Sequence, residues 1–92
     1  MIMAYYVYIL RLRDGSLYTG IAKDVEKRMS QHMKGKGSRY VRSRLPFSVV
    51  YTEESPTCSD AMKREAQIKR LPRSSKLFLI GARQEGPGSR SA

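Results

Sequence analysis

The 92-residue sequence has very few of the side chains that build disulfides and zinc sites. Cys58 is the only cysteine, so no internal disulfide can form. His32 is the only histidine, and one cysteine with one histidine cannot supply the ligands of a cysteine/histidine zinc site. A chain of this length is expected to fold as one domain around a single modest hydrophobic core.

Long apolar runs are also missing. No stretch comes near the roughly 20 apolar residues that a transmembrane helix needs. Residues 1–6, MIMAYY, lack the charged region and the long apolar stretch of a secretory signal peptide. We therefore expect a protein that has no membrane segment and stays in the cytoplasm.

Acidic residues are scarce: eight Asp and Glu face 18 Lys and Arg, which leaves a net charge of +10. A charge of this size creates a strong positive field around a small protein, and the field attracts polyanions, nucleic acid above all. We prefer this interpretation to one in which the charge serves only solubility. Basic residues cluster in residues 34–44, which contain no acid, and in residues 63–76, where Glu65 is the single acid. No helix pairs a broad apolar face with a basic one, so a membrane surface is a weaker interpretation.

Runs of Tyr, Val and Ile predict three β-strands, at residues 4–12, 16–20 and 46–52. The first run is apolar on both alternating faces as far as Arg11, which is typical of a strand in the centre of a sheet. A helix is predicted after the cap residue Asp24. It covers residues 25–33 and carries an apolar stripe formed by Val25, Met29 and Met33.

Two more helices are predicted, one ending near residue 71 and a short one at residues 76–80. The order of elements indicates a two-layer α/β or α+β domain on a small, largely antiparallel sheet. Residues 82–92 are mostly Gly, Ser and Arg, so we expect a disordered tail after a domain of residues 1–81. The expected caps and stops are Thr57 or Ser59 with Pro72, and Ser74 or Ser75 with Gly81.

Four of the six tyrosines lie in the first two strands, which Asp14-Gly15 joins. With a two-residue loop, Tyr8 and Tyr18 point to opposite faces of the sheet and cannot share a site. With a three-residue loop and Gly15 in the left-handed conformation, the two tyrosines share one face as diagonal neighbours. A glycine after an aspartate suits the second register well.

Glu65 is the most informative single position. On the second predicted helix it shares a stripe with Ala61 and Ile68, so its carboxylate should face the body of the protein. A carboxylate in that place needs a cation or hydrogen-bond donors. An ion pair with an arginine and a bound divalent metal are both compatible with the pattern.

Arg28 and His32 lie four residues apart, hence on one face of the first predicted helix. A guanidinium beside an imidazole can hold a phosphate and move a proton. A solvated arginine and a satisfied boundary histidine are the plainer interpretation. For the tyrosines the plainer interpretation is amphipathic packing, with the ring buried and the hydroxyl at the rim.

Together these residues resemble the GIY-YIG nuclease superfamily, and most closely its small single-domain bacterial members of YhbQ or YazA type. The resemblance covers residues 4–80. It departs from the family where Tyr6 replaces the glycine of the first motif, and the chain has no asparagine, which some members place after the glutamate. The residues that carry it are Tyr6-Val7-Tyr8, Tyr18-Thr19-Gly20, Arg28, His32 and Glu65.

The resemblance implies a three-stranded antiparallel sheet flanked by helices, and an endonuclease that depends on Mg²⁺ or Mn²⁺. It assigns Tyr8 to the attacking water, Arg28 to the scissile phosphate, His32 to a place near the nucleophile, and Glu65 to the metal. Tyr18 matches the tyrosine of the second motif, and we expect it to handle the water together with Tyr8.

The sequence thus predicts hydrolysis of DNA phosphodiester bonds, directed by the structure of the DNA more than by its sequence. A partner protein that supplies specificity is a further expectation. The alternatives are a non-catalytic DNA- or RNA-binding module and, less well supported by the charge, a protein-interaction adaptor. The expected nucleic-acid-binding residues are Lys34, Lys36, Arg39, Tyr40, Arg42, Arg44, Lys69 and Arg70.

Overall fold

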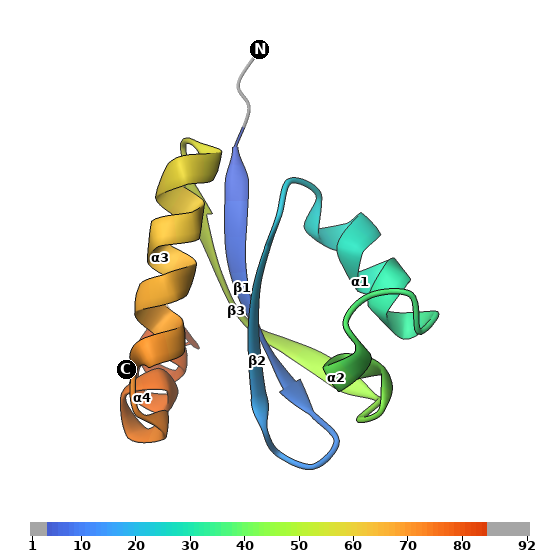
Figure 1. The fold of residues 1–92 in the computed structure, drawn as a ribbon. Helices are drawn as coiled ribbons and strands as arrows, with labels where there is room; N and C mark the ends of the chain where they lie inside the picture. The colour runs from blue at the N-terminus through green and yellow to red at the C-terminus, as the bar shows by residue number, and fades with distance from the viewer. Residues whose placement is uncertain (1–3, 85–92) are drawn as a thin grey trace.

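The computed structural model describes residues 4–84 of the chain (Figure 1). Three strands form one antiparallel sheet in the order β2-β1-β3, which confirms the central place predicted for the first strand. Within residues 4–84, no helix has both the length and the apolar character needed to cross a membrane. The elements are β1 (Tyr5–Leu12), β2 (Leu17–Ala22), α1 (Val25–Met33), α2 (Arg39–Arg42), β3 (Phe47–Ser55), α3 (Cys58–Arg70) and α4 (Arg73–Gln84).

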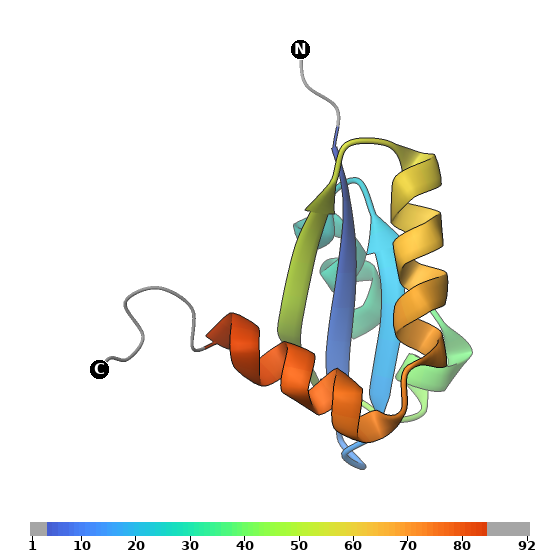
Figure 2. The same ribbon diagram turned by 90° about the vertical axis from the view of Figure 1, so that its left-hand side faces the viewer.

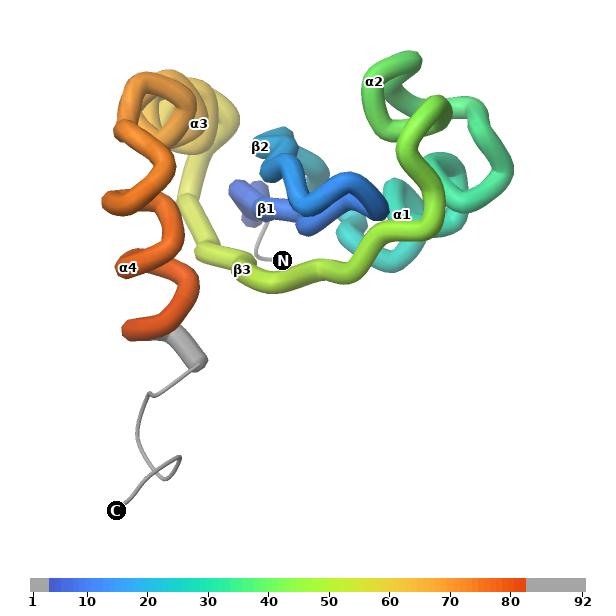
Figure 3. Tube along the Cα trace, turned by 90° about the horizontal axis from the view of Figure 1, so that it is seen from below, coloured from blue at the N-terminus to red at the C-terminus, as the bar shows by residue number. Residues whose placement is uncertain are grey.

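Helices cover both faces of the sheet, so the domain has three layers and not the two that we expected. Figure 3 shows α3 and α4 on one side of the strands and α1 and α2 on the other. The cause is β1, whose alternate residues are buried in both directions. On the α3 and α4 side the core is Val7, Ile9, Tyr51, Ala61, Ile68 and Ile80; on the opposite side it is Tyr8, Leu10, Leu12 and Val41.

The hairpin between β1 and β2 has the three-residue loop. Leu12 N–H donates to Ser16 O at 2.9 Å, and Gly15, with φ of 87°, donates to Leu12 O at 2.9 Å. In this register Tyr8 lies opposite Gly20, and Tyr18 is its diagonal neighbour on the same face of the sheet. The register that brings the two tyrosines together is therefore confirmed.

Helix α1 begins as predicted, because the Asp24 side chain accepts a hydrogen bond from Lys27 N at 3.0 Å. Its predicted apolar stripe is wrong at one position: Met33 is 62% exposed, and His32 is buried in its place. The inward stripe follows Val25, Met29 and His32, at i, i+4 and i+7 of the helix. The predicted helical periodicity is correct, but the third inward position holds the polar His32 and not Met33.

Helix α3 starts at the predicted cap, with Asp60 N donating to Thr57 Oγ1 at 3.0 Å. Helix α4 differs from the prediction at both ends. It begins at Arg73, with the Pro72 carbonyl accepting from the backbone N–H groups of Ser75 and Lys76. It continues past Gly81 to Gln84, so residues 82–84 are helical, and residues 85–92 of the expected tail lie outside the described residues.

Two further corrections concern the segment between α1 and α3. Residues 39–42, which we expected in an irregular basic loop, form the short helix α2. Strand β3 extends three residues beyond the predicted end, to Ser55, because it pairs with β1 along its whole length. The bulge in this pairing lies between Ile9 and Leu10 of β1. In Figure 2, α4 runs across the lower end of the sheet while α3 runs along it.

Gly20 is expected to be indispensable for stability, whereas Gly81 is not. A Cβ atom on Gly20 would lie 2.5 Å from the Tyr8 hydroxyl oxygen, and a Cβ on Gly81 would meet nothing within 4 Å. Gly20→Ala should lower the free energy of unfolding by about 1–3 kcal/mol through overpacking. Gly81→Ala should raise it by up to about 1 kcal/mol through helix propensity. Urea unfolding of both variants is the measurement; equal stabilities would contradict the packing argument.

Candidate active site

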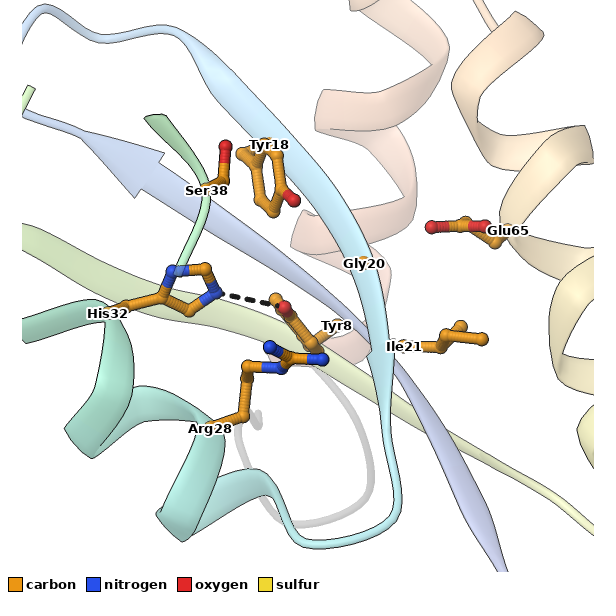
Figure 4. Close-up of a pocket in the computed structure, with 8 residues that line it drawn as sticks. All are labelled: Tyr8, Tyr18, Gly20, Ile21, Arg28, His32, Ser38 and Glu65. Atoms are coloured by element: carbon orange, nitrogen blue, oxygen red, sulfur yellow. Dashed lines mark hydrogen bonds between the residues drawn. The ribbon is translucent and has the colours of Figure 1, made fainter. Parts of the chain in front are cut away.

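A pocket of about 200 Å³ opens where β2 passes between α1 and α3 (Figure 4). All five residues that the sequence predicts to be catalytic line it, although they come from four different elements. Their proximity is therefore a fact of the fold, while their catalytic roles stay predictions. The lining consists of Tyr8, Tyr18, Gly20, Ile21, Arg28, His32, Ser38 and Glu65.

A hydrogen bond between Tyr8 and His32 forms the buried floor of this pocket. The Tyr8 hydroxyl oxygen lies 3.0 Å from His32 Nε2, and the two residues are 2% and 1% exposed. Gly37 packs against the far edge of the imidazole, where a Cβ atom would overlap Nδ1. Phe47 lies edge-on to the same ring. Among residues 4–84, Nδ1 has no hydrogen-bond partner, so Tyr8 is the polar group that orients the imidazole.

The same burial sets the protonation of the pair. Burial raises the pKa of Tyr8 to about 12; Tyr18 and Glu65 add to the rise, and Arg28 opposes it. Burial also lowers the pKa of His32, and the nearby Arg28 guanidinium acts in the same direction. At neutral pH the pair is a phenol and a neutral imidazole. The phenol can donate its proton to Nε2 when that nitrogen carries none.

Tyr18 is held by aromatic rings from three elements. Its ring centroid lies 6.5 Å from that of Tyr8, 5.8 Å from that of His32 and 6.4 Å from that of Tyr40. The His32 ring meets it edge-on, and the Tyr40 ring is nearly parallel to it, at 22°. Tyr18 is half-buried, so its position depends on these neighbours as well as on β2.

Arg28 supplies the positive charge of the pocket. Figure 4 shows its side chain rising from α1 toward Tyr8. Its Nη1 makes a long contact of 3.5 Å with the Gln31 amide oxygen, and within the described chain it has no carboxylate partner. A half-buried guanidinium without a counter-ion can bind an anion such as a phosphate through paired hydrogen bonds.

Glu65 provides the one carboxylate that lines the pocket, reaching it from α3. Its side chain is 23% exposed, and the cation beside it is Lys69, with Nζ 3.4 Å from Oε2, not an arginine. Ala61 and Ile68, on the same stripe, are fully buried as predicted. In the part of the chain that the structure describes, no three acidic, histidine or cysteine side chains gather into a metal site.

This oxygen-only donor set fits Mg²⁺. A single, partly exposed carboxylate in a pocket that two tyrosines also line offers the hard oxygen ligand that Mg²⁺ prefers. Mg²⁺ also keeps several of its own waters, so it does not need the three-ligand cluster that is missing here. The same oxygen ligands suit Mn²⁺.

The predicted nucleic-acid-binding residues fall into two groups on either side of β2 (Figure 1). Arg44 differs from the others, because its Nε donates to Asp14 at 2.9 Å and its Nη1 to the Tyr40 carbonyl at 3.1 Å. It is half-buried and engaged within the protein. The exposed residues are Lys34, Lys36, Arg39, Tyr40 and Arg42 between α1 and the end of α2, and Lys69 and Arg70 at the end of α3.

Sequence reasoning missed several residues that shape the pocket. Gly20 is part of a recognised motif, but its role, making room for Tyr8, depends on the strand register. Ser38 lines the pocket and caps α2 by accepting from Tyr40 N at 3.1 Å. A serine before a short helical segment is a usable signal for the cap. Gly37 and Ile21 carry no signal that would place them at the site.

Comparison with known proteins agrees with this geometry. A family model described as the GIY-YIG catalytic domain matches residues 4–77. A UPF0213 protein of Staphylococcus saprophyticus is 50% identical over 76 residues, which span 83% of this chain and 93% of that protein. A UPF0213 protein of Oceanobacillus iheyensis is 51% identical over 76 residues, which span 83% of this chain and 88% of that protein.

Two solved structures share the fold. The solution NMR structure of the UPF0213 protein from Bacillus halodurans has a TM-score of 0.59 and 44% identity, covering 92% of this chain and 89% of that chain. The solution NMR structure of a protein from E. faecalis has a TM-score of 0.64 and 31% identity, covering 97% and 95% of the two chains. The resemblance predicted from the motifs is thereby confirmed: the chain belongs to the GIY-YIG family.

Proposed function

We propose that the protein is an endonuclease that depends on Mg²⁺ or Mn²⁺ and hydrolyses DNA phosphodiester bonds. The observation that carries this proposal is one pocket lined by the buried Tyr8–His32 pair, by the Glu65 carboxylate and by Arg28, which has no carboxylate partner among residues 4–84. The net charge of +10 supports a nucleic-acid substrate. In this proposal, recognition follows the structure of the DNA or depends on a partner protein.

In this mechanism Arg28 holds the scissile phosphate in the pocket. Its paired N–H groups match two phosphate oxygens and balance their negative charge. The phosphate would then lie above the Tyr8 hydroxyl, within reach of a water that Tyr8 and Tyr18 orient. Binding energy is used for positioning, which is the main task in phosphoryl transfer.

The Tyr8–His32 pair moves the proton. A phenol with a pKa of about 12 is a poor base at neutral pH, so it must lose its own proton as it takes one from water. His32 Nε2 at 3.0 Å is placed to accept it, and the lowered pKa of His32 keeps the imidazole neutral and able to do so. Tyr8 therefore relays a proton from the attacking water to His32.

Glu65 would hold the metal, which supplies Lewis-acid stabilisation of the phosphate and of the leaving oxygen. Figure 4 shows Glu65 on one wall of the pocket and the Tyr8–His32 pair on another. Metal binding and proton transfer would therefore take place on separate walls. Lys69 lies beside Glu65 and must give up its contact when a metal binds.

Glu65→Gln should abolish metal-dependent cleavage and leave DNA binding nearly unchanged. Loss of the carboxylate removes the metal, and we expect cleavage to fall by at least about 100-fold. The assay compares plasmid, single-stranded and branched DNA with and without Mg²⁺. Glu54→Gln is the matched control, because Glu54 is exposed on β3 and does not line the pocket.

Two outcomes of that assay separate the hypotheses. Equal cleavage by wild type and Glu65→Gln would contradict the metal role. Tight binding without Mg²⁺-dependent products from any substrate would favour the non-catalytic binding module instead.

The pH dependence should report His32. Cleavage by the wild type is expected to decline only at a pH below the ordinary imidazole pKa of about 6.5, because burial lowers the pKa of His32 in the folded protein. His32→Gln should reduce the rate at pH 7 by roughly 10²–10⁴-fold. Its remaining rate should rise about tenfold per pH unit between pH 7 and 10, because Tyr8 must then ionise to solvent.

Rates measured between pH 5 and 10 test this relay, and a pH profile unchanged in His32→Gln would refute it. Tyr8→Phe, which keeps the ring, is the companion variant and should lose activity at every pH. Since the pKa of His32 is lower in the folded state, the unfolded chain binds more protons below pH 6.5. The contribution of His32 to the free energy of unfolding is therefore fully present above pH 6.5 and falls as the pH drops below that value. Folding must accordingly be checked at each pH.

Salt dependence of DNA binding should identify the exposed basic residues that contact phosphates. The double variant Arg39→Ala/Arg42→Ala is expected to reduce the log–log salt slope by about one per lost phosphate contact. Arg11→Ala, an exposed arginine on β1 outside both basic groups, is the control. Binding measured from 50 to 200 mM salt decides: equal slopes for the three proteins would show that α2 does not contact the backbone.

A further inference from the structure

A chain of contacts links the hairpin loop to Tyr18 through α2. The Tyr40 ring lies nearly parallel to that of Tyr18, with centroids 6.4 Å apart. The Arg44 guanidinium carbon lies over the Tyr40 ring, 3.8 Å from its centroid. Arg44 in turn pairs with Asp14, in the loop that joins the two tyrosine-bearing strands. The contacts thus leave β2 at Tyr18 and return to its hairpin at Asp14.

Arg44 makes more hydrogen bonds than an isolated ion pair on the surface would make. Its Nε donates to Asp14 Oδ2 at 2.9 Å, and its Nη1 donates to the Tyr40 carbonyl at 3.1 Å and to Ser43 Oγ at 2.8 Å. Asp14 is itself held by Ser16, through the backbone N–H at 3.0 Å and the hydroxyl at 2.6 Å. These bonds leave the guanidinium little freedom to move away from the Tyr40 ring.

Helix α2 cannot hold Tyr40 in place by itself. It has four residues, fewer than an isolated helix needs to form in water. Its attachments are the Ser38 cap, the fully buried Val41 and the bonds made by Arg44. The position of the Tyr40 ring therefore depends on contacts with the body of the protein, and among these Arg44 is the one that touches the ring.

The arrangement disfavours the role that the sequence suggests for Tyr40. We expected this exposed tyrosine to stack on an unpaired base. The Arg44 guanidinium lies over the Tyr40 ring and the nearly parallel Tyr18 ring is its other neighbour, although the side chain remains 41% exposed. A base that stacked on the face covered by Arg44 would have to displace the guanidinium, and this would disturb the contacts that hold Tyr40 beside Tyr18.

We propose that Tyr40 is a positioning residue for Tyr18, held by Arg44 and Asp14, and not a platform for a nucleobase. This inference rests on the proposed function, since it assigns Tyr40 to the pocket in which Tyr18 acts. The Tyr18 ring has Tyr8 and His32 as its other aromatic neighbours, and Tyr40 is the neighbour that comes from outside the β1, β2 and α1 framework. Removing Tyr40 releases that side of the ring.

The test compares Tyr40→Leu with Tyr40→Phe. Tyr40→Leu should lower the single-turnover cleavage rate with Mg²⁺ by roughly 10–100-fold, because small displacements of a reacting group are costly. The Kd for single-stranded and branched DNA without Mg²⁺ should stay within about twofold. Tyr40→Phe keeps the ring and should restore the rate. Phe78→Leu, an aromatic 78% exposed on α4, is the matched control with no effect on either quantity.

If Tyr40 were a stacking platform for a base, Tyr40→Leu would weaken DNA binding and leave the cleavage rate of the bound complex unchanged. Loss of base stacking weakens binding by roughly 10–100-fold. A weakened Kd for Tyr40→Leu, with the rate of the bound complex unchanged, would overturn the positioning role.

A second readout does not need catalysis. NOEs between the rings of Tyr18 and His32, whose centroids lie 5.8 Å apart, should weaken in Tyr40→Leu and persist in Tyr40→Phe. Asp14→Asn, which touches neither ring, should weaken them partly. If the wild type cleaves no DNA, the proposed function fails, and these NOEs with the unchanged Kd still support the positioning role. NOEs unchanged in Tyr40→Leu would overturn it even in an active enzyme.

Discussion

The register of the β1–β2 hairpin is the constraint on which the rest of the site depends. Two backbone hydrogen bonds across Leu12, Gly15 and Ser16 fix it. Because side chains alternate along a strand, this register sends Tyr8 and Tyr18 toward α1. A slip of one residue in the pairing would leave the tyrosines on opposite faces. No contact made by the helices can compensate for that, since the phenols would then be separated by the sheet itself.

Given that register, two glycines allow the pocket floor to close. Gly20 makes room for the phenol and Gly37 for the imidazole, and at both positions a side chain would overlap the ring. In the part of the chain that the structure describes, closure leaves His32 Nδ1 buried without a hydrogen-bond partner, and such a group costs about 1–3 kcal/mol. The same burial shifts the pKa values of both partners, and such shifts are concentrated at functional sites in proteins.

Most of the fold was predictable because local signals agreed with one another. Caps at Asp24 and Thr57, and the Asp-Gly turn, each act within a few residues, and the structure confirms them. The wrong predictions share one cause, because tertiary contacts and not local sequence determined the structure at those positions. Helix α2 has no periodicity to detect and exists through its attachments. His32 is buried instead of Met33, since Tyr8 satisfies a polar atom that hydrophobicity alone would place in solvent. The roles of the five pocket residues came from the resemblance, and their convergence came from the fold.

Not all of the positive charge of the chain is available to a ligand, because several arginines make contacts within the protein. Arginines at 13, 44, 64 and 73 are engaged with Leu45 O, Asp14, Glu53 and Gly15 O. They tie loops and helices to the sheet. The exposed residues among those predicted to bind nucleic acid lie beside α2 and at the end of α3, on opposite sides of β2. Within the described residues, Arg28 has no carboxylate partner. Under the proposed function, a nucleic acid that contacts both groups would cross β2, whose residues Tyr18, Gly20 and Ile21 line the pocket.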